Sequence, residues 1–97
     1  MNALVCQAIR ERRVLRFHYD GGARVVEPHC HGFTMDGNEL LSGYQVSGAS
    51  RSGERFGWKS FRLDRIRALI VSDEAFAGPR AGYDANDVRI FEIHCRL

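Results

Sequence analysis

The sequence has 97 residues, of which 44% are hydrophobic and 27% are charged, and its net charge is +2. This length and composition are typical of a folded globular chain with one core, so we expect a single domain spanning residues 1–97. No apolar run approaches the ~20 residues that a membrane helix needs, and the charged N-terminal stretch lacks the apolar core of a signal peptide. We therefore expect a cytoplasmic protein with no membrane partner.

The first stretch of the chain is amphipathic and predicts a helix over residues 2–13. Asn2 can cap this helix, and apolar residues then recur at helical spacing between charged ones. From residue 14 the apolar period changes to two, and the sequence DGGA at residues 20–23 predicts a hairpin loop. In the expected register Tyr19 pairs with Arg24. The other expected pairs are Phe17 with Val26, Arg16 with Glu27, and Leu15 with Pro28.

A second tight turn is predicted at residues 35–38, where the sequence MDGN supplies an Asp-Gly pair. The expected cross-strand pairs around this turn are Phe33 with Leu40, His31 with Ser42, and His29 with Tyr44. The third strand then runs over residues 39–46. The glycine-punctuated loop 47–55 has two open interpretations, a mobile ligand-facing segment or a plain solvated connection.

The rest of the chain continues as short strands at close spacing. We expect strands over residues 57–63 and 66–72, a break at residues 77–83, and a closing strand over residues 88–95. This pattern predicts a mainly β fold, a small β-barrel of about five strands over residues 14–76. The C-terminal extension, residues 77–97, follows that barrel.

Three cysteines are present, Cys6, Cys30 and Cys95, and none of them is in a CxxC pair. Their odd number and spacing argue against a disulfide framework and against a four-cysteine zinc site, so we expect buried thiols.

The stretch EPHCHGF, residues 27–33, raises the question of a metal site. On a regular strand His29 and His31 share one face while Cys30 points to the other, so the three cannot converge on one ion. His94 and Cys95 could approach only if the last strand lay beside this one. We therefore expect no metal and no cofactor, with Cys30 in the core and both histidines on a polar face. The same facing argument disfavours a Cys30 nucleophile with a histidine base, and hence an enzyme.

Arginine supplies thirteen of the fourteen basic residues, and six basic residues fall within residues 51–67. The planar guanidinium suits phosphate and carboxylate groups, although a general arginine bias of composition would give the same count. Alternation along residues 58–63 puts Trp58, Ser60 and Arg62 on one side of a strand. Asp64, between Arg62 and Arg65, could orient both guanidiniums toward an anionic ligand, or could form a purely structural salt bridge.

Several segments of the chain resemble the WYL domain of bacterial regulators. They are RRVLRFHYDG, RVVEPHCHGF followed by a turn and LLSGYQ, and SFRLDRIRALIVSDEAF. The resemblance covers residues 3–76, and its sharpest match is FRLDRI at residues 61–66. The tail after residue 77 looks like that of small stand-alone members. The resemblance implies an Sm-like barrel, of the Src-homology-3 type, that senses a ligand or binds nucleic acid and is not an enzyme.

Two departures from the family pattern stand out. Where the family carries its Trp-Tyr-Leu, this chain has Glu39-Leu40-Leu41, so Tyr44 and Trp58 would have to supply the aromatic contacts. The chain also has no room for the DNA-binding domain that is usually fused to these regulators, so a separate DNA-binding regulator is one candidate partner.

These observations predict a module that recognises an anionic small molecule or single-stranded nucleic acid. The predicted ligand-binding residues are Arg62, Arg65, Tyr44, Ser60, Trp58, Arg51, His29 and His31. The alternative hypothesis is a structural module that assembles homo-oligomers through barrel edges, as Sm-like rings do.

Overall fold

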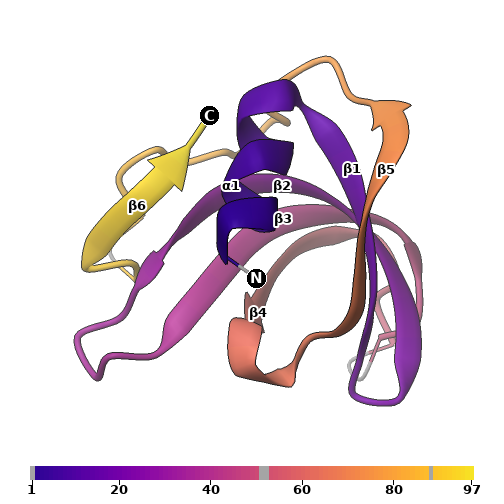
Figure 1. The fold of residues 1–97 in the computed structure, drawn as a ribbon, viewed down its shortest axis with the longest axis horizontal. Helices are drawn as coiled ribbons and strands as arrows, with labels where there is room; N and C mark the ends of the chain where they lie inside the picture. The colour runs from indigo at the N-terminus through magenta and orange to yellow at the C-terminus, as the bar shows by residue number, and fades with distance from the viewer. Residues whose placement is uncertain (1, 51–52, 88) are drawn as a thin grey trace.

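A computed structural model describes residues 2–50, 53–87 and 89–97. One helix precedes six strands (Figure 1), so the predicted mainly β fold with an N-terminal helix is confirmed. The elements in chain order are α1 (Asn2–Glu11), β1 (Arg13–Tyr19), β2 (Gly22–Phe33), β3 (Glu39–Gly48), β4 (Gly57–Arg62), the 3-10 turn η1 (Leu63–Arg65), β5 (Arg67–Ala75) and β6 (Glu92–Arg96).

The helix ends two residues earlier than the predicted bound at residue 13. Arg12 has a φ of 54°, which turns the backbone out of the helix and into β1. None of the helices in the described ranges is long and apolar enough to cross a membrane.

All strand pairs are antiparallel, and the strands follow the order β4-β3-β2-β1-β5. The long β2 pairs with β1 at its beginning, through residues 22–26, and with β6 at its end, through residues 30–33. β3 pairs with β2 along nearly its whole length. The sheet therefore has six strands, and its closure into a barrel stays a prediction.

The core lies between α1 and the sheet, because α1 turns one apolar stripe inward. The residues of that stripe are Val5, Cys6, Ala8 and Ile9. Beneath them Phe61 makes edge-to-face contacts with Phe17 and Tyr19, each at 5.0 Å between ring centroids. β1 and β4 are thus fixed to each other through aromatic side chains.

The register of the first hairpin differs from the prediction by two residues. Tyr19 pairs with Gly22, because Asp20 and Gly21 form a two-residue turn with φ angles of 50° and 76°. A shift of two keeps every side chain on its predicted face, so Phe17 and Tyr19 are buried as expected. The predicted pair of Arg16 with Glu27 is wrong.

The register of the second hairpin differs by one residue. The turn lies at the predicted place, but the loop is residues 34–38, so Phe33 pairs with Glu39 and His31 with Leu41. An irregularity between Pro28 and Cys30 shifts the pairing again. The expected pairs of His31 with Ser42 and of His29 with Tyr44 are therefore wrong, and Glu39 comes close to His31.

The later strands occupy the predicted regions with shifted bounds. β3 runs to Gly48, β5 to Ala75, and Leu63 belongs to η1 rather than to β4. The closing strand, predicted over residues 88–95, is β6 at Glu92–Arg96, and Val88 lies outside the described residues. β6 lies beside β2, with Cys95 opposite His31.

Candidate functional site

The predicted site residues do not form one site. Ser60 lines one hollow, Arg65 pairs with its lining residue Asp20, and the Arg62 backbone N–H donates to the hydroxyl of its lining residue Tyr19. His29, Tyr44 and Trp58 form an aromatic group elsewhere. His31 belongs to a third group, with two cysteines and a second histidine. Arg51 lies outside the described residues.

The two predicted arginines have different partners. Arg62 donates from Nε and Nη2 to the two carboxylate oxygens of Asp64, at 3.2 and 2.8 Å. Arg65 pairs instead with Asp20 of the first hairpin and lies over the Tyr19 ring, 5.1 Å from its centroid. The expectation that Asp64 orients both guanidiniums is therefore wrong. Asp64 and Arg65 lie in η1, the turn that leads into β5.

A hollow of about 180 Å³ lies beside these arginines, and we name it the Arg24 hollow. Its lining residues are Tyr19, Asp20, Arg24, Ser50, Lys59, Ser60 and Phe61. The carboxylate among these lining residues belongs to Asp20, the partner of Arg65. Ser60 lines the hollow, and Arg62 follows it two residues later along β4.

Arg24 is one of the lining residues that the sequence did not single out. It is 4% exposed, and its Nη1 and Nη2 donate to the Gln45 side-chain oxygen at 3.3 Å and the Tyr19 carbonyl at 3.1 Å. Both acceptors are neutral, and its Nε is buried with no hydrogen-bond partner among the described residues. A buried guanidinium with a free donor is costly, and an arriving anion would relieve that cost.

His29, Tyr44, Trp58, Phe76 and Tyr83 form a second group, which we name the aromatic cluster. Tyr44 and Trp58 are opposite each other on β3 and β4, with ring centroids 5.7 Å apart. Trp58 lies 4.7 Å from His29 and stacks on Tyr83 at 6.1 Å. The aromatic contacts expected of Tyr44 and Trp58 are therefore made with the chain itself.

The C-terminal extension covers this aromatic cluster. Arg80 lies over the Tyr44 ring, 4.5 Å from its centroid, and donates to both Glu27 carboxylate oxygens at 2.8 and 3.1 Å. Trp58 Nε1 donates to the Ala81 carbonyl at 3.1 Å. Residues 80–83 thus occupy the surface that a stacked ligand would need.

His29 is held in one neutral tautomer. Its Nδ1 donates to the Glu27 carbonyl at 2.8 Å, and its Nε2 accepts from the Arg80 backbone N–H at 3.1 Å. Burial lowers the pKa of His29, which favours this neutral form. Both His29 and His31 are completely buried, so the expected polar histidine face is not available at the surface.

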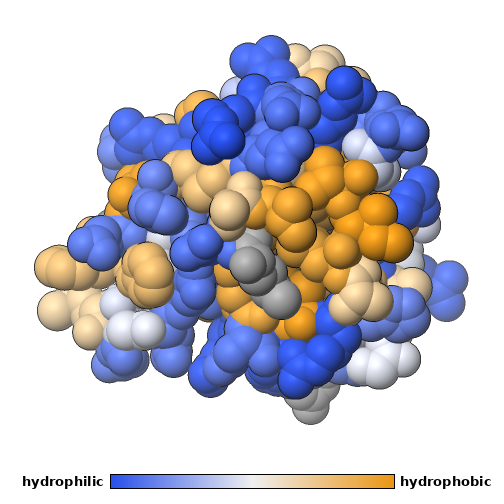
Figure 2. Space-filling view, viewed as in Figure 1, coloured by the Kyte–Doolittle hydropathy of each residue, from blue (hydrophilic) through white to orange (hydrophobic). Residues whose placement is uncertain are grey.

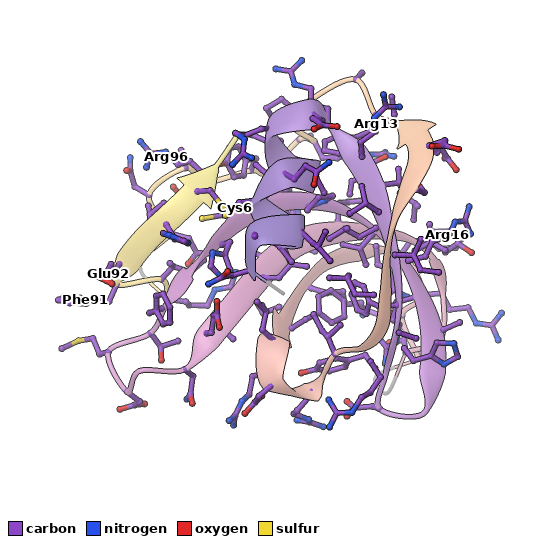
Figure 3. All side chains as sticks on the ribbon, in the orientation of Figure 1. Cys6, Arg13, Arg16, Phe91, Glu92 and Arg96 are labelled. Atoms are coloured by element: carbon purple, nitrogen blue, oxygen red, sulfur yellow. A yellow bond between two sulfur atoms is a disulfide. The ribbon has the colours of Figure 1, made fainter. Side chains whose placement is uncertain are left out.

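Cys6, His31, His94 and Cys95 form a third group, which we name the sulfur–imidazole cluster. Cys6 of α1 and Cys95 of β6 form a disulfide, with their Cα atoms 5.8 Å apart (Figure 3). The expectation of free thiols is therefore wrong for these two cysteines. It is confirmed for Cys30, which is free and buried in the core.

The two histidines approach this disulfide closely. His31 Nδ1 lies 3.8 Å from Cys6 Sγ and 3.2 Å from His94 Nδ1, and the other nitrogen of His31 donates to Glu39 Oε2 at 2.6 Å. Burial lowers the pKa of His31, although the hydrogen bond to Glu39 acts in the opposite direction. Within the stretch EPHCHGF, His31 alone joins this cluster. The facing argument accounts for the absence of Cys30, whereas His29 packs against Trp58 in the aromatic cluster.

A family model for the WYL domain matches residues 2–71. The chain belongs to the WYL domain family. WYL domains are ligand-sensing regulatory modules and are typically non-catalytic. Comparisons with curated proteins and with solved structures gave no match.

This WYL domain departs from the family pattern at Glu39-Leu40-Leu41, and the structure gives those residues other roles. Leu41 is buried in the core, and Glu39 binds His31. At the start of this segment, where the resemblance places the family's tryptophan, a carboxylate therefore orients an imidazole.

Proposed function

We propose that this WYL domain senses an anionic ligand, a nucleotide or single-stranded nucleic acid, at the Arg24 hollow. The observation that supports this most strongly is the buried Arg24 side chain, which has neutral acceptors on Nη1 and Nη2 and a free Nε. A phosphate group supplies acceptor oxygens and negative charge together, and guanidinium groups bind it well.

The size of the hollow defines which part of a ligand would enter it. A volume of about 180 Å³ is below the roughly 300–1,000 Å³ of sites that enclose a whole drug-sized molecule. A phosphate would therefore occupy the hollow, with the Ser60 hydroxyl as a further donor. The rest of the ligand would extend across the neighbouring surface, where Arg62 and Arg65 carry exposed guanidiniums.

Arg62 and Arg65 suit this outer role. Their ion pairs with Asp64 and Asp20 are solvent-exposed on the arginine side, and exposed pairs contribute little to stability. A ligand phosphate can therefore compete for these guanidiniums at small cost. Tyr44, Trp58 and His29 would contribute only indirectly while residues 80–83 cover the aromatic cluster, and His31 belongs to the separate sulfur–imidazole cluster.

A structural module that forms homo-oligomers is the second candidate. Ile70 of β5 is 59% exposed, and β5 lies at one end of the strand order. Figure 2 shows apolar side chains gathered beside α1, over β1 and β5. In this alternative the sheet closes as an Sm-like barrel, and copies associate through β5.

Titration with a short, labelled, single-stranded oligonucleotide at two salt concentrations tests the proposed function. We expect binding whose affinity falls steeply with salt, because phosphate contacts release counterions. Sedimentation of the same samples measures the oligomeric state. A defined oligomer that binds neither the oligonucleotide nor a nucleoside triphosphate would contradict ligand sensing and favour the structural module.

A further inference from the structure

The sulfur–imidazole cluster brings together the donor atoms of a tetrahedral metal site, although its two sulfurs are bonded to each other in this structure. One ligand atom from each of Cys6, His31, His94 and Cys95 lies within 4.8 Å of all the others. The separations that involve His31 and His94 are 3.8 and 3.9 Å to Cys6 Sγ and 3.2 Å between their Nδ1 atoms. Zinc bonds of about 2.3 Å to sulfur and 2.0–2.1 Å to nitrogen put tetrahedral donors about 3.3–3.8 Å apart.

Three distant parts of the chain bring these donors together. Cys6 comes from α1, His31 from β2, and His94 and Cys95 from β6. β6 pairs with β2 so that Cys95 is opposite His31, and Figure 3 shows Cys6 pointing from α1 toward β6. Helix and paired strands fix the donor positions, as a preorganised metal site requires.

Glu39 prepares His31 for metal binding. The Nε2–H of His31 donates to the Glu39 carboxylate at 2.6 Å, which leaves Nδ1 as the nitrogen with a free lone pair. That Nδ1 is the atom nearest to Cys6 and His94. A carboxylate behind a ligating histidine is the usual outer partner in zinc sites.

We propose that the reduced chain binds one zinc ion through Cys6, His31, His94 and Cys95, and that the disulfide is the metal-free form of the same site. Two sulfurs and two imidazole nitrogens form a set that favours zinc. This proposal replaces the expectation of no metal, because the last strand does lie beside residues 29–33.

The conversions between the disulfide form and the zinc form conserve atoms and electrons. A dithiol reductant transfers two electrons and two protons to the disulfide, which gives two thiols and leaves the reductant as a cyclic disulfide. Zinc binding then displaces both thiol protons. In the reverse direction, a small-molecule disulfide takes two electrons from the two thiolates and, with two protons, leaves as two thiols. The Cys6–Cys95 bond forms and zinc is released.

Either form ties β6 to α1 through Cys6 and Cys95, whereas the reduced metal-free chain has no such cross-link. β6 ends the extension whose residues 80–83 cover the aromatic cluster. Zinc would therefore keep the extension in place where thiols stay reduced, and the disulfide would do so where they are oxidised.

Cobalt(II) titration of the full chain, reduced with a phosphine under anaerobic conditions, tests the proposal. Tetrahedral cobalt with thiolate ligands gives intense visible bands and a thiolate-to-cobalt charge-transfer band in the near ultraviolet. We expect both, at one cobalt per chain, and their loss when equimolar zinc is added. The disulfide-bonded chain should give neither.

Matched variants show which residues bind the metal. His94→Ala and Cys95→Ser should lose the tetrahedral spectrum, whereas His18→Ala and Cys30→Ala should keep it. His94 is exposed, so its replacement leaves the core intact, and His18 is an exposed histidine on β1. No cobalt binding by the reduced parent, or an unchanged spectrum in His94→Ala, would overturn the proposal.

Glu39 is tested separately as a positioning residue. Glu39→Gln keeps an acceptor near His31 but removes its charge, so cobalt affinity should fall roughly 10–100-fold with the charge-transfer band retained. Thermal unfolding of the disulfide-bonded Glu39→Gln chain should match that of the parent. An unchanged cobalt affinity would remove Glu39 from the site.

Discussion

The Arg24 hollow and the sulfur–imidazole cluster lie on the same sheet, but they are assembled differently. Around the hollow, Arg62 pairs with a carboxylate only two residues away, in the turn that follows β4. In the cluster, Cys6 and Cys95 are 89 residues apart and meet because β6 lies beside β2. The Arg62–Asp64 pair beside the hollow thus depends on local sequence, whereas the cluster depends on the completed fold.

The two regions also differ in what their contacts contribute. Exposed ion pairs beside the hollow add little stability and leave guanidiniums available to a ligand. The cross-link in the cluster restricts nearly the whole unfolded chain. Ligand binding and stability should therefore respond to different substitutions, and the predictions below test that separation.

The largest effect is expected from opening the disulfide without supplying metal. A cross-link between residues 89 apart stabilises the fold by roughly 4–5 kcal/mol in the chain-entropy picture. Urea unfolding of the reduced chain, with a chelator present, should show this loss. The Cys6→Ser variant has no such cross-link and serves as the control. Adding the reductant should not change its stability. Equal stability of the parent before and after reduction would contradict the structural role.

The next effect concerns ligand binding at Arg24. Arg24→Met keeps much of the side-chain length but removes the donors, so affinity for the oligonucleotide should fall by about 1.5–3 kcal/mol. Arg16→Met is the control, because it removes an exposed arginine that pairs with Glu74 on the neighbouring strand. This variant should bind the oligonucleotide with nearly the affinity of the parent. If the two variants bind equally well, Arg24 is not the centre of the site.

A smaller loss is expected at Arg62, because this arginine is 44% exposed and already shares its donors with Asp64. Arg62→Ala should weaken binding by about 0.5–1.5 kcal/mol and leave the unfolding midpoint nearly unchanged. Arg62→Lys keeps the charge without the planar fork, so full affinity in this variant would show that charge alone suffices. A lowered midpoint with intact binding would make Arg62 structural.

The smallest effect is expected at Arg80. Arg80→Ala removes the contacts with Glu27 and Tyr44 and should destabilise the fold by about 0.5–1 kcal/mol. Trp58 is the sole tryptophan, so quenching of its fluorescence by acrylamide reports directly on whether residues 80–83 cover the aromatic cluster. Quenching should increase in Arg80→Ala. It should stay constant in Arg89→Ala, whose arginine pairs locally with Asp87.

The sequence predicted the features that depend on local chemistry. Period-two alternation, the Asp-Gly turn and the inward-facing Phe17 follow from neighbouring residues, and the structure confirms them. The predicted register of the first hairpin was wrong by two residues, which left every side chain on its predicted face of the sheet. The predicted register of the second hairpin was wrong by one residue, and the actual register places Glu39 near His31.

The features that the sequence did not predict depend on long-range pairing. Burial of Arg24 requires Gln45 from β3 as its neighbour, and the disulfide requires β6 to reach β2. A cluster with His94 and Cys95 requires the last strand to lie beside residues 29–33, and no local sequence pattern determines that pairing. The contact that covers Trp58 likewise comes from Ala81, which is 23 positions away in the sequence.

The side-chain Nε–H of Arg24 offers the most direct test of ligand sensing at the hollow. This proton is buried and has no partner among the described residues, so it should give a resolved nuclear magnetic resonance signal that responds to an acceptor. On titration with the oligonucleotide, or with a nucleoside triphosphate, we predict a saturable shift of the Arg24 signal with little change at Arg16. Saturable binding that leaves the Arg24 signal unmoved would contradict the account.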